Sequence, residues 1–407
     1  YWFDTRPSVN RLARDRTEDL LHNKVDDLDL EIVSRLRYKL KKGSFAAVHI
    51  APSSSGEVSD EKEAKLVILG PGYPHTSKKG ALSVAKERAE LILNTRGEGP
   101  RIYKNTLVFL APDSERLLEL RESVSQLLAW KSIDRDKEGL NLNAFDRKQV
   151  ETSSDRAEQA VAIRIKETFI WLLLPTQDDS KISEITWNAS RINASNGDSL
   201  PEKVSRRLID DGQLITSWSP VNLKIELDNL LWKDKSHIDV KTLWDYLSTY
   251  LYLPRLANED VFIRAISEGL RSKDYFGYAD KVEDNGKYLG LVFGTGRSNI
   301  NRDGLSVLVR PEVAQQQLDE DARKTGPIPP VTGSGVGTSL GGTSVGGTGV
   351  SGTTKIPPID PVTTPKPKAR RFHGTVDLDL SRPIPNAGQI VENVIQHLQS
   401  GDGTRVL

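Results

Sequence analysis

Three short apolar runs in the first third of the chain limit the fold more than any other feature. They are FAAVHI at 45–50, LVIL at 66–69 and LVFL at 107–110, and each is continuous instead of alternating with polar residues. Strands that are covered on both faces, as in a parallel sheet, have this pattern. The segment 81–97 between the second and third runs has helical spacing and ends at Gly97, which suits a helix C-cap. The sequence therefore predicts an α/β domain with a parallel sheet.

The order of the predicted elements between residues 237 and 293 is also informative. VKTLWDYLSTYLY and NEDVFIRAISEGL are predicted helices separated by a short turn with Pro254. Two predicted strands, 275–280 and 287–293, then flank Asn285-Gly286, and Asn-Gly between apolar alternations is a strong hairpin signal. Helix, turn, helix and hairpin in this order predict a winged helix. In winged helices that bind DNA, the second helix enters the major groove and the hairpin contacts the backbone.

Exposed polar side chains of this second helix and hairpin are the candidate nucleic-acid-binding residues. They are Arg264, Ser267, Arg271, Lys273, Lys281, Lys287 and Arg297. Residues 255–310 hold nine Lys and Arg against eight Asp and Glu, which is a net charge of only +1. Neutralisation of phosphates supplies most nonspecific affinity for DNA. Binding of double-stranded DNA, docking of a protein and a purely structural role therefore remain alternatives for this region.

Changes in composition divide the chain into segments. We expect the α/β domain to cover residues 8–150 and the helical and winged-helix region to cover 151–322. Residues 326–369 are rich in Gly, Ser, Thr and Pro, which predicts a disordered linker over 323–370. RFHGTVDLDL and NAGQIVENVIQHL then predict a small, truncated β-α tail over 371–407. The expected class is thus α/β, with a helical winged-helix region, a tether and an α+β tail.

The overall composition excludes several classes of function. Lys plus Arg and Asp plus Glu both total 56, so no net charge attracts the chain to nucleic acid or to an anionic membrane. The chain has no cysteine, which excludes disulfides and thiolate chemistry. It has no methionine either, which is unusual for a chain of otherwise ordinary composition. No apolar run is long enough to span a membrane, and no signal peptide is recognisable, so we expect a cytoplasmic protein without a membrane partner.

Asp113 is the one catalytic candidate, and a simpler interpretation competes with it. It follows the third apolar run and precedes SERLLELRESVSQLLAW, a predicted amphipathic helix. Ligands of open α/β sheets bind beyond the carboxyl ends of the strands, which permits a role in chemistry. An Asp in front of a helix more often caps its free N–H groups, so we expect a cap. His49 is expected to be a satisfied core histidine and His75 a loop residue, because neither has a partner at metal-ligand spacing.

Several segments together resemble a known protein family. They are YWFDTRPSVNRLARDR, LVILGPGYPH, RGEGPRIYKNTLVFLAPD followed by LLAWKSI, LWDYLSTYLYLPRL, and RFHGTVDLDLSRP with IVENVIQHL. They resemble the C-terminal half of the prokaryotic proteins grouped as domain of unknown function 499. The resemblance covers nearly the whole chain apart from the linker. Proteins of this family are large AAA-like ATPases, commonly found with DNA methylases in defence-associated gene clusters.

The resemblance implies a non-catalytic region that couples an ATPase to DNA in a DNA-modification or phage-defence system. The chain has no G-x-x-x-x-G-K-[ST] loop, so ATP and Mg²⁺ are expected for the parent protein and no cofactor is expected here. Residues 1–7 look like the end of a preceding winged-helix domain. The resemblance suggests two further roles. Asn105 would be an ATPase sensor, and Arg6, Arg11 or Arg14 would be an arginine finger that contacts the nucleotide bound by a neighbouring subunit.

The alternative function is a protein-interaction scaffold. Such a scaffold would dock a DNA methylase or another defence protein without direct DNA contact.

Overall fold

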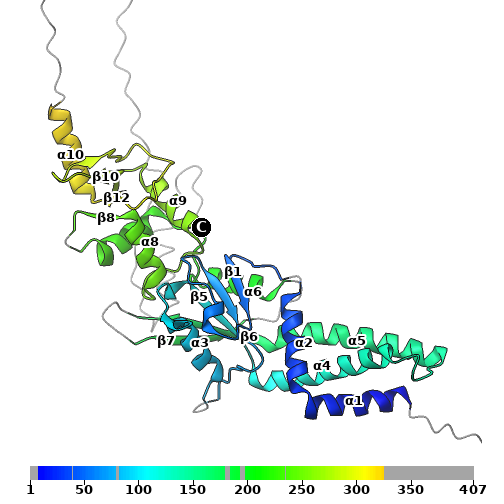
Figure 1. Ribbon diagram of the computed structural model, residues 1–407. Coiled ribbons are helices and arrows are strands. Elements are labelled where there is room, and N and C mark those ends of the chain that lie inside the picture. Colours follow the sequence, from blue (N-terminus) through cyan, green and yellow to red (C-terminus); the bar gives the residue numbers. More distant parts are fainter. Residues whose placement is uncertain are drawn as a thin grey trace, which may run out of the picture. The chain divides into compact units, whose positions relative to one another are not determined.

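The computed structural model describes most of the chain up to Lys324 (Figure 1). The described residues are 8–38, 40–78, 82–178, 184–192, 198–233 and 235–324. They belong to one unit of mixed α/β structure. The expected end of a preceding winged-helix domain at 1–7, the linker from residue 325 onward and the tail at 371–407 lie outside the described residues.

A five-stranded sheet forms the centre of the first part of the chain, with the strand order β1-β2-β5-β6-β7. β1, β2 and β5 pair in parallel, as the three apolar runs predict, and β6 and β7 extend the sheet in antiparallel orientation. All residues of β2 and β5 are buried. The strands are β1 (Ala47–Ile50), β2 (Lys65–Ile68), β5 (Leu107–Pro112), β6 (Phe169–Thr176) and β7 (Thr186–Arg191).

β6 corrects an expectation from the sequence. EQAVAIRIKETFIWLLLP predicts one apolar helix that ends at Pro175, but the helix ends at Thr168 and FIWLLLP forms β6. The first seven residues of β6 are all buried between β5 and β7, whereas a helix would expose some of them. The expected domain boundary between residues 150 and 151 therefore falls inside a helix, and the sheet continues to Arg191.

The first five helices lie around this sheet or project from it. α3 connects β2 to β5, and α4 directly follows β5. α1, α4 and α5 pack along one another and extend away from the sheet as an elongated group (Figure 1). Buried side chains of Val9, Ala13, Ile133 and Val150 form a small core within this group. The helices are α1 (Val9–Asn23), α2 (Val25–Arg37), α3 (Val84–Asn94), α4 (Ser114–Arg135) and α5 (Ala144–Thr168).

Gly97 does not cap α3, contrary to expectation. Thr95 is the C-cap, and Gly97 lies in the turn of a small hairpin of β3 (Thr95–Arg96) and β4 (Gly99–Pro100). This turn requires a positive φ of 60° at Gly97, which glycine adopts without the steric penalty of a Cβ atom.

The second part of the chain has the predicted order of helix, turn, helix and hairpin. β8, β12 and β9 form a three-stranded antiparallel sheet in that order, and β10 and β11 form the hairpin around Asn285-Gly286. The strands are shorter than predicted. The helices are α6 (Leu200–Asp210), α7 (Pro220–Glu226), a π-helical turn (Leu227–Leu231), α8 (Val240–Thr249), α9 (Glu259–Gly269) and α10 (Pro311–Lys324); the strands are β8 (His237–Asp239), β9 (Gly277–Ala279), β10 (Lys281–Val282), β11 (Tyr288–Leu289) and β12 (Val307–Val309).

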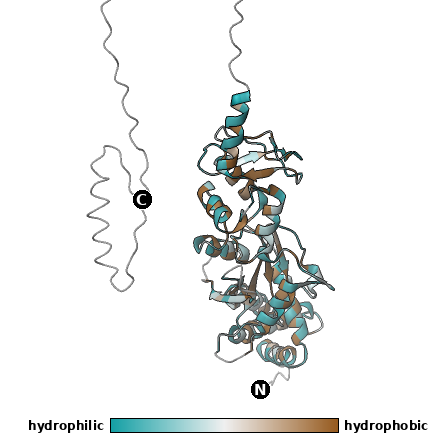
Figure 2. Cartoon of the chain, turned by 90° about the vertical axis from the view of Figure 1, so that its left-hand side faces the viewer, coloured by the Kyte–Doolittle hydropathy of each residue, from teal (hydrophilic) through white to brown (hydrophobic). Residues whose placement is uncertain are grey.

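Each part has its own hydrophobic core. The first core surrounds the five-stranded sheet and the second lies between α7, α8, α9 and the three-stranded sheet. In Figure 2, hydrophobic segments concentrate in the interior, while α1 and α10 are mainly hydrophilic. Within the part of the chain that the structure describes, no helix is long and apolar enough to cross a membrane.

Two buried polar residues join the sheet to the second part. The Asn105 amide donates hydrogen bonds to the carbonyl groups of Leu247 (2.8 Å) and Leu253 (3.1 Å). Arg255 donates from Nε to the carbonyl of Asn105 (2.6 Å) and from a terminal nitrogen to that of Pro175 (3.2 Å). Burial lowers the pKa of Arg255 to about 10. These contacts connect the turn before β5 (Lys104–Thr106) and the strand β6 to α8 and to the segment between α8 and α9.

Candidate functional site

α9 buries one face in the second core and leaves the other open to solvent. The side chain of Asn258 caps the helix by accepting a hydrogen bond from the backbone N–H of Val261 (3.2 Å). On the outer face Arg264 is exposed and Ser267 is half-buried, and Arg271 is exposed just after the helix ends. Arg264 and Ser267 are three residues apart in the helix and therefore share one side of it. The buried face holds Val261, Phe262, Ile263, Ala265 and Ile266.

Four of the predicted nucleic-acid-binding cations remain available to a ligand. Arg264 Nε donates only to the carbonyl of Asp260 in its own helix (3.2 Å). Lys273 is exposed, donates to the Gln315 side chain (3.0 Å) and lies 5.7 Å from the centre of the Phe293 ring. Arg271 and Lys281 are exposed. None of these four forms an ion pair with another described residue.

The other two predicted cations hold the structure together. Lys287 pairs with Asp321 of α10 (3.0 Å). Arg297 pairs with both oxygens of Asp280 (2.9 and 2.8 Å) and stacks over the Tyr278 ring at 4.9 Å. The hydrogen bond from Arg297 to Asp280 raises the pKa of the guanidinium. Both residues are thus committed to internal contacts, which the spacing of basic residues in the sequence could not reveal.

Asp113 is the N-cap of α4, as expected. One carboxylate oxygen accepts hydrogen bonds from the backbone N–H groups of Glu115 and Arg116 (3.1 Å each). The other accepts a hydrogen bond from the Trp171 indole (2.8 Å) and lies 3.8 Å from Arg191. Burial raises the pKa of Asp113, but the hydrogen bonds and the Arg191 charge outweigh it and hold the pKa below its usual value. These contacts occupy both oxygens, so the geometry favours the cap over catalysis.

His75 lies in the segment between β2 and α3, as expected of a loop residue, but it is buried beside Asp113. Its backbone N–H donates to the carbonyl of Pro112 (2.8 Å), and its carbonyl accepts from the N–H of Ser114 (3.0 Å). Its Nδ1 lies 2.7 Å from the Ser83 hydroxyl. Burial and the nearby Lys86 lower the pKa of His75, although Asp113 opposes this. The sequence contained one signal for the contact between His75 and Asp113. Each residue follows the carboxyl end of a predicted strand, and neighbouring parallel strands bring such ends together.

The remaining residues singled out from the sequence are dispersed. His49 is half-buried on β1, and its Nε2 has no hydrogen-bond partner among the described residues, so the expectation of a satisfied core histidine was wrong. The Asn105 amide is engaged with α8 and the turn after it, which leaves no free donor for a nucleotide. Arg11 and Arg14 are exposed on α1, and Arg6 lies outside the described residues.

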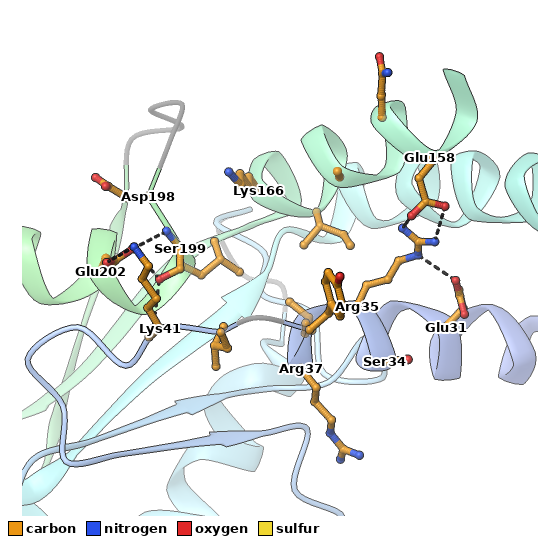
Figure 3. Close-up of a pocket in the computed structure, with 17 residues that line it drawn as sticks. Glu31, Ser34, Arg35, Arg37, Lys41, Glu158, Lys166, Asp198, Ser199 and Glu202 are labelled. Carbon is orange, nitrogen blue, oxygen red and sulfur yellow. Dashed lines mark hydrogen bonds and ion pairs between the residues drawn. The ribbon is translucent and has the colours of Figure 1, made fainter. Parts of the chain in front are cut away.

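Sequence reasoning missed a pocket between α2, α5 and α6 (Figure 3). Its volume is about 850 Å³. Its walls come from three segments that are distant in the sequence, 31–41, 158–166 and 198–202, so no local motif could have indicated it. No group of three or more His, Asp or Glu residues that could hold a metal ion occurs within the described ranges.

Comparisons of the chain with protein-family models, with curated proteins and with solved structures found no match. Its function must therefore be inferred from the geometry of its own residues.

Proposed function

We propose that residues 237–324 form a winged-helix module that binds double-stranded DNA. The observation that carries this proposal is the connection β8-α8-α9-β9 followed by the β10-β11 hairpin and β12, with the sheet order β8-β12-β9. This is the order of elements in winged helices, where the second helix enters the major groove. On the outer face of α9, Arg264 and Glu268 are exposed and Ser267 is half-buried, and insertion into a groove requires such exposed side chains.

The proposal assigns different roles to the basic residues of the module. Arg264 and Ser267 share one side of α9 and, together with Arg271 in the turn after the helix, would face the DNA. Lys273 and Lys281 would contact phosphates, because they are exposed and flank the helix and the hairpin. Lys287 and Arg297 would act indirectly by fixing the hairpin to α10 and to β9. Contacts to phosphates position a protein on DNA, whereas contacts to base edges select a sequence.

In a larger protein of the kind that the chain resembles, this module would couple an AAA-like ATPase to DNA. The parent protein would bind ATP and Mg²⁺ outside this chain and would act in a DNA-modification or phage-defence system. The buried contacts of Asn105 and Arg255 support the coupling, because they tie the module to the five-stranded sheet. A displacement of the sheet would then move α9 with it.

Fluorescence anisotropy with a labelled duplex over a salt series tests the proposal. We expect binding at low salt whose affinity falls steeply as salt rises. The double variant Arg264→Ala/Arg271→Ala should weaken binding about tenfold or more and lower the salt slope by roughly one unit per lost phosphate contact. Arg156→Ala, which removes an exposed cation of α5, is the matched control and should bind like the wild type. No binding of the wild type at low salt would overturn the proposal.

The charge of the module favours the scaffold as a second candidate function. Glu259 and Asp260 at the start of α9 pair with Arg302 (2.9 and 3.3 Å), and Glu268 is exposed beside Arg264. An interface with mixed charges suits a protein partner better than a phosphate backbone. This function predicts that a DNA methylase from the same gene cluster co-purifies in high salt and is lost on deletion of residues 371–407. Retention by the deleted chain would exclude the tail as the docking segment.

A further inference from the structure

The outer face of α9 carries charges of alternating sign. Asp260, Arg264 and Glu268 follow one another at intervals of four residues, and all three are exposed. Side chains at this spacing are neighbours on one face of a helix. Arg271, in the turn after the helix, is exposed as well. The carboxylate of Glu268 therefore comes between two arginines on the face that we propose to bind DNA.

The carboxylates at the start of α9 are already paired. Arg302 forms ion pairs with Glu259 (2.9 Å) and with Asp260 (3.3 Å). The backbone carbonyl of Asp260 accepts a hydrogen bond from Arg264 Nε (3.2 Å). These contacts fix the first turn of the helix and hold the Arg264 side chain at its Nε atom. They involve neither the terminal nitrogens of Arg264 nor the carboxylate of Glu268.

Arg264 and Glu268 do not neutralise each other. They are four residues apart, and Lys224 and Asp228 form an ion pair at the same spacing (2.9 Å). Among the described residues, however, the terminal nitrogens of Arg264 and the carboxylate of Glu268 have no hydrogen-bond or ion-pair partner. A guanidinium group and a carboxylate thus remain available to a ligand as neighbours on an exposed helix face.

The two groups have different uses on DNA. A carboxylate repels phosphates, so a Glu on a DNA-binding face weakens the general attraction to DNA. In the major groove a carboxylate has a specific use, because it accepts a hydrogen bond from the amino group of cytosine, whereas a guanidinium group donates two hydrogen bonds to O6 and N7 of guanine. Residues four apart in a helix are about 6 Å apart along its axis, and successive bases of a strand are about 3.4 Å apart. The two side chains therefore suit bases that are one or two steps apart.

We propose that Arg264 and Glu268 select the DNA sequence, with Arg264 contacting a guanine and Glu268 a cytosine one or two base-pair steps away. This inference rests on the proposed binding of DNA by the winged-helix module. It also accounts for the net charge of only +1 over residues 255–310, since a carboxylate that reads bases increases selectivity while it lowers nonspecific affinity. Lys273 and Lys281 would supply the contacts to phosphates that position the helix.

Selection from a pool of duplexes with a random central region tests the inference on the full chain. We expect enrichment of a guanine and a cytosine at fixed positions one or two steps apart. Replacing either selected base pair by A·T should weaken binding about tenfold in fluorescence anisotropy. Binding of the pool without a preference for these bases would overturn the base contacts and leave the proposed DNA binding intact. No binding of the pool at low salt would overturn both proposals and favour a protein partner for the mixed charges.

Variants of Glu268 separate base recognition from a structural role. Glu268→Ala should lose the discrimination at the cytosine position, and it should bind nonspecific duplexes more tightly because a negative charge near the phosphates is removed. Glu268→Gln should shift the preference at that position towards adenine, which an amide side chain contacts in the major groove. A residue with a structural role alone would produce neither change.

Arg264→Ala and a control of matched charge complete the test. Arg264→Ala should lose the discrimination at the guanine position and weaken binding to all duplexes. Glu122→Ala removes an exposed carboxylate from α4 and changes the net charge as Glu268→Ala does, but it should alter neither the affinity nor the preference. Unchanged discrimination in both Glu268 variants would contradict the assignment.

Discussion

Glu158 illustrates how a single carboxylate contributes to stability. Hydrogen bonds from Arg35, joined by Lys131, lower the pKa of Glu158 from 4.5 to about 2, although burial acts in the opposite direction. A carboxyl group with a depressed pKa in the folded state stabilises the fold above its unfolded pKa and loses this effect as the pH falls. The contribution of Glu158 is therefore complete above about pH 4.5 and disappears towards about pH 2.

Glu158→Gln should destabilise the protein near neutral pH and have much less effect in acid. The side chain of Glu158 is 47% exposed, so solvent screening limits the expected loss to about 1 kcal/mol or less. Urea unfolding near pH 7 and at about pH 3 measures the difference, with Glu151→Gln as a control from an exposed pair of α5. A difference between wild type and Glu158→Gln that is equal at both pH values would contradict the prediction.

Asp113 should prove to be a structural residue. Because it caps α4 and accepts the Trp171 hydrogen bond, Asp113→Ala should cost about 1–2 kcal/mol of unfolding free energy. Asp113→Asn keeps a good capping residue and should cost less. Chemical denaturation measures the free energy of unfolding of both variants. Equal stability of Asp113→Ala and Asp113→Asn would exclude helix capping as the main role of Asp113.

At the scale of the elements, the packing of α9 depends on a close contact between Gly269 and the Phe276 ring. A Cβ atom at Gly269 would lie 2.4 Å from the Phe276 ring. Replacing Gly by Ala within a helix usually stabilises it by about 1 kcal/mol, but here the methyl group would push α9 away from β9. Gly269→Ala should therefore destabilise the protein by about 1–3 kcal/mol. Gly72→Ala is the control, because a Cβ atom there meets nothing within 4 Å, and a stabilised Gly269→Ala variant would refute the packing.

The elements also show what the sequence can and cannot reveal. The runs at 45–50, 66–69 and 107–110 predicted parallel strands correctly, because short continuous apolar runs are typical of strands that are covered on both faces. FIWLLLP was assigned to a helix because it directly follows a helical pattern, and periodicity does not distinguish a short buried strand from a buried helix. Lys287 and Arg297 form ion pairs with Asp321 and Asp280, which lie elsewhere in the sequence. No local pattern contains that information.

At the scale of the whole molecule, Arg255 links the two hydrophobic cores. Arg255→Met would leave the carbonyl groups of Asn105 and Pro175 without their donor in a buried place, and unpaired buried groups cost about 1–3 kcal/mol each. Hydrogen exchange should then accelerate in both β5 and α8. Arg310→Met is the control, since Arg310 donates to the carbonyl groups of Lys233 and Lys235 within the second part alone. Acceleration confined to one part in Arg255→Met would argue against a link.

The same link has a consequence for how the chain folds. The hydrogen bond between Arg255 and Asn105 joins residues that are 150 positions apart. Contacts of such large sequence separation form slowly, because a long loop must close before they stabilise anything. The turn before β5 and the strand β6 must also be in place, since they supply the carbonyl groups of Asn105 and Pro175 that Arg255 binds. Newly made chains should therefore pass through a stage in which the sheet is complete and the segment after α8 has yet to dock.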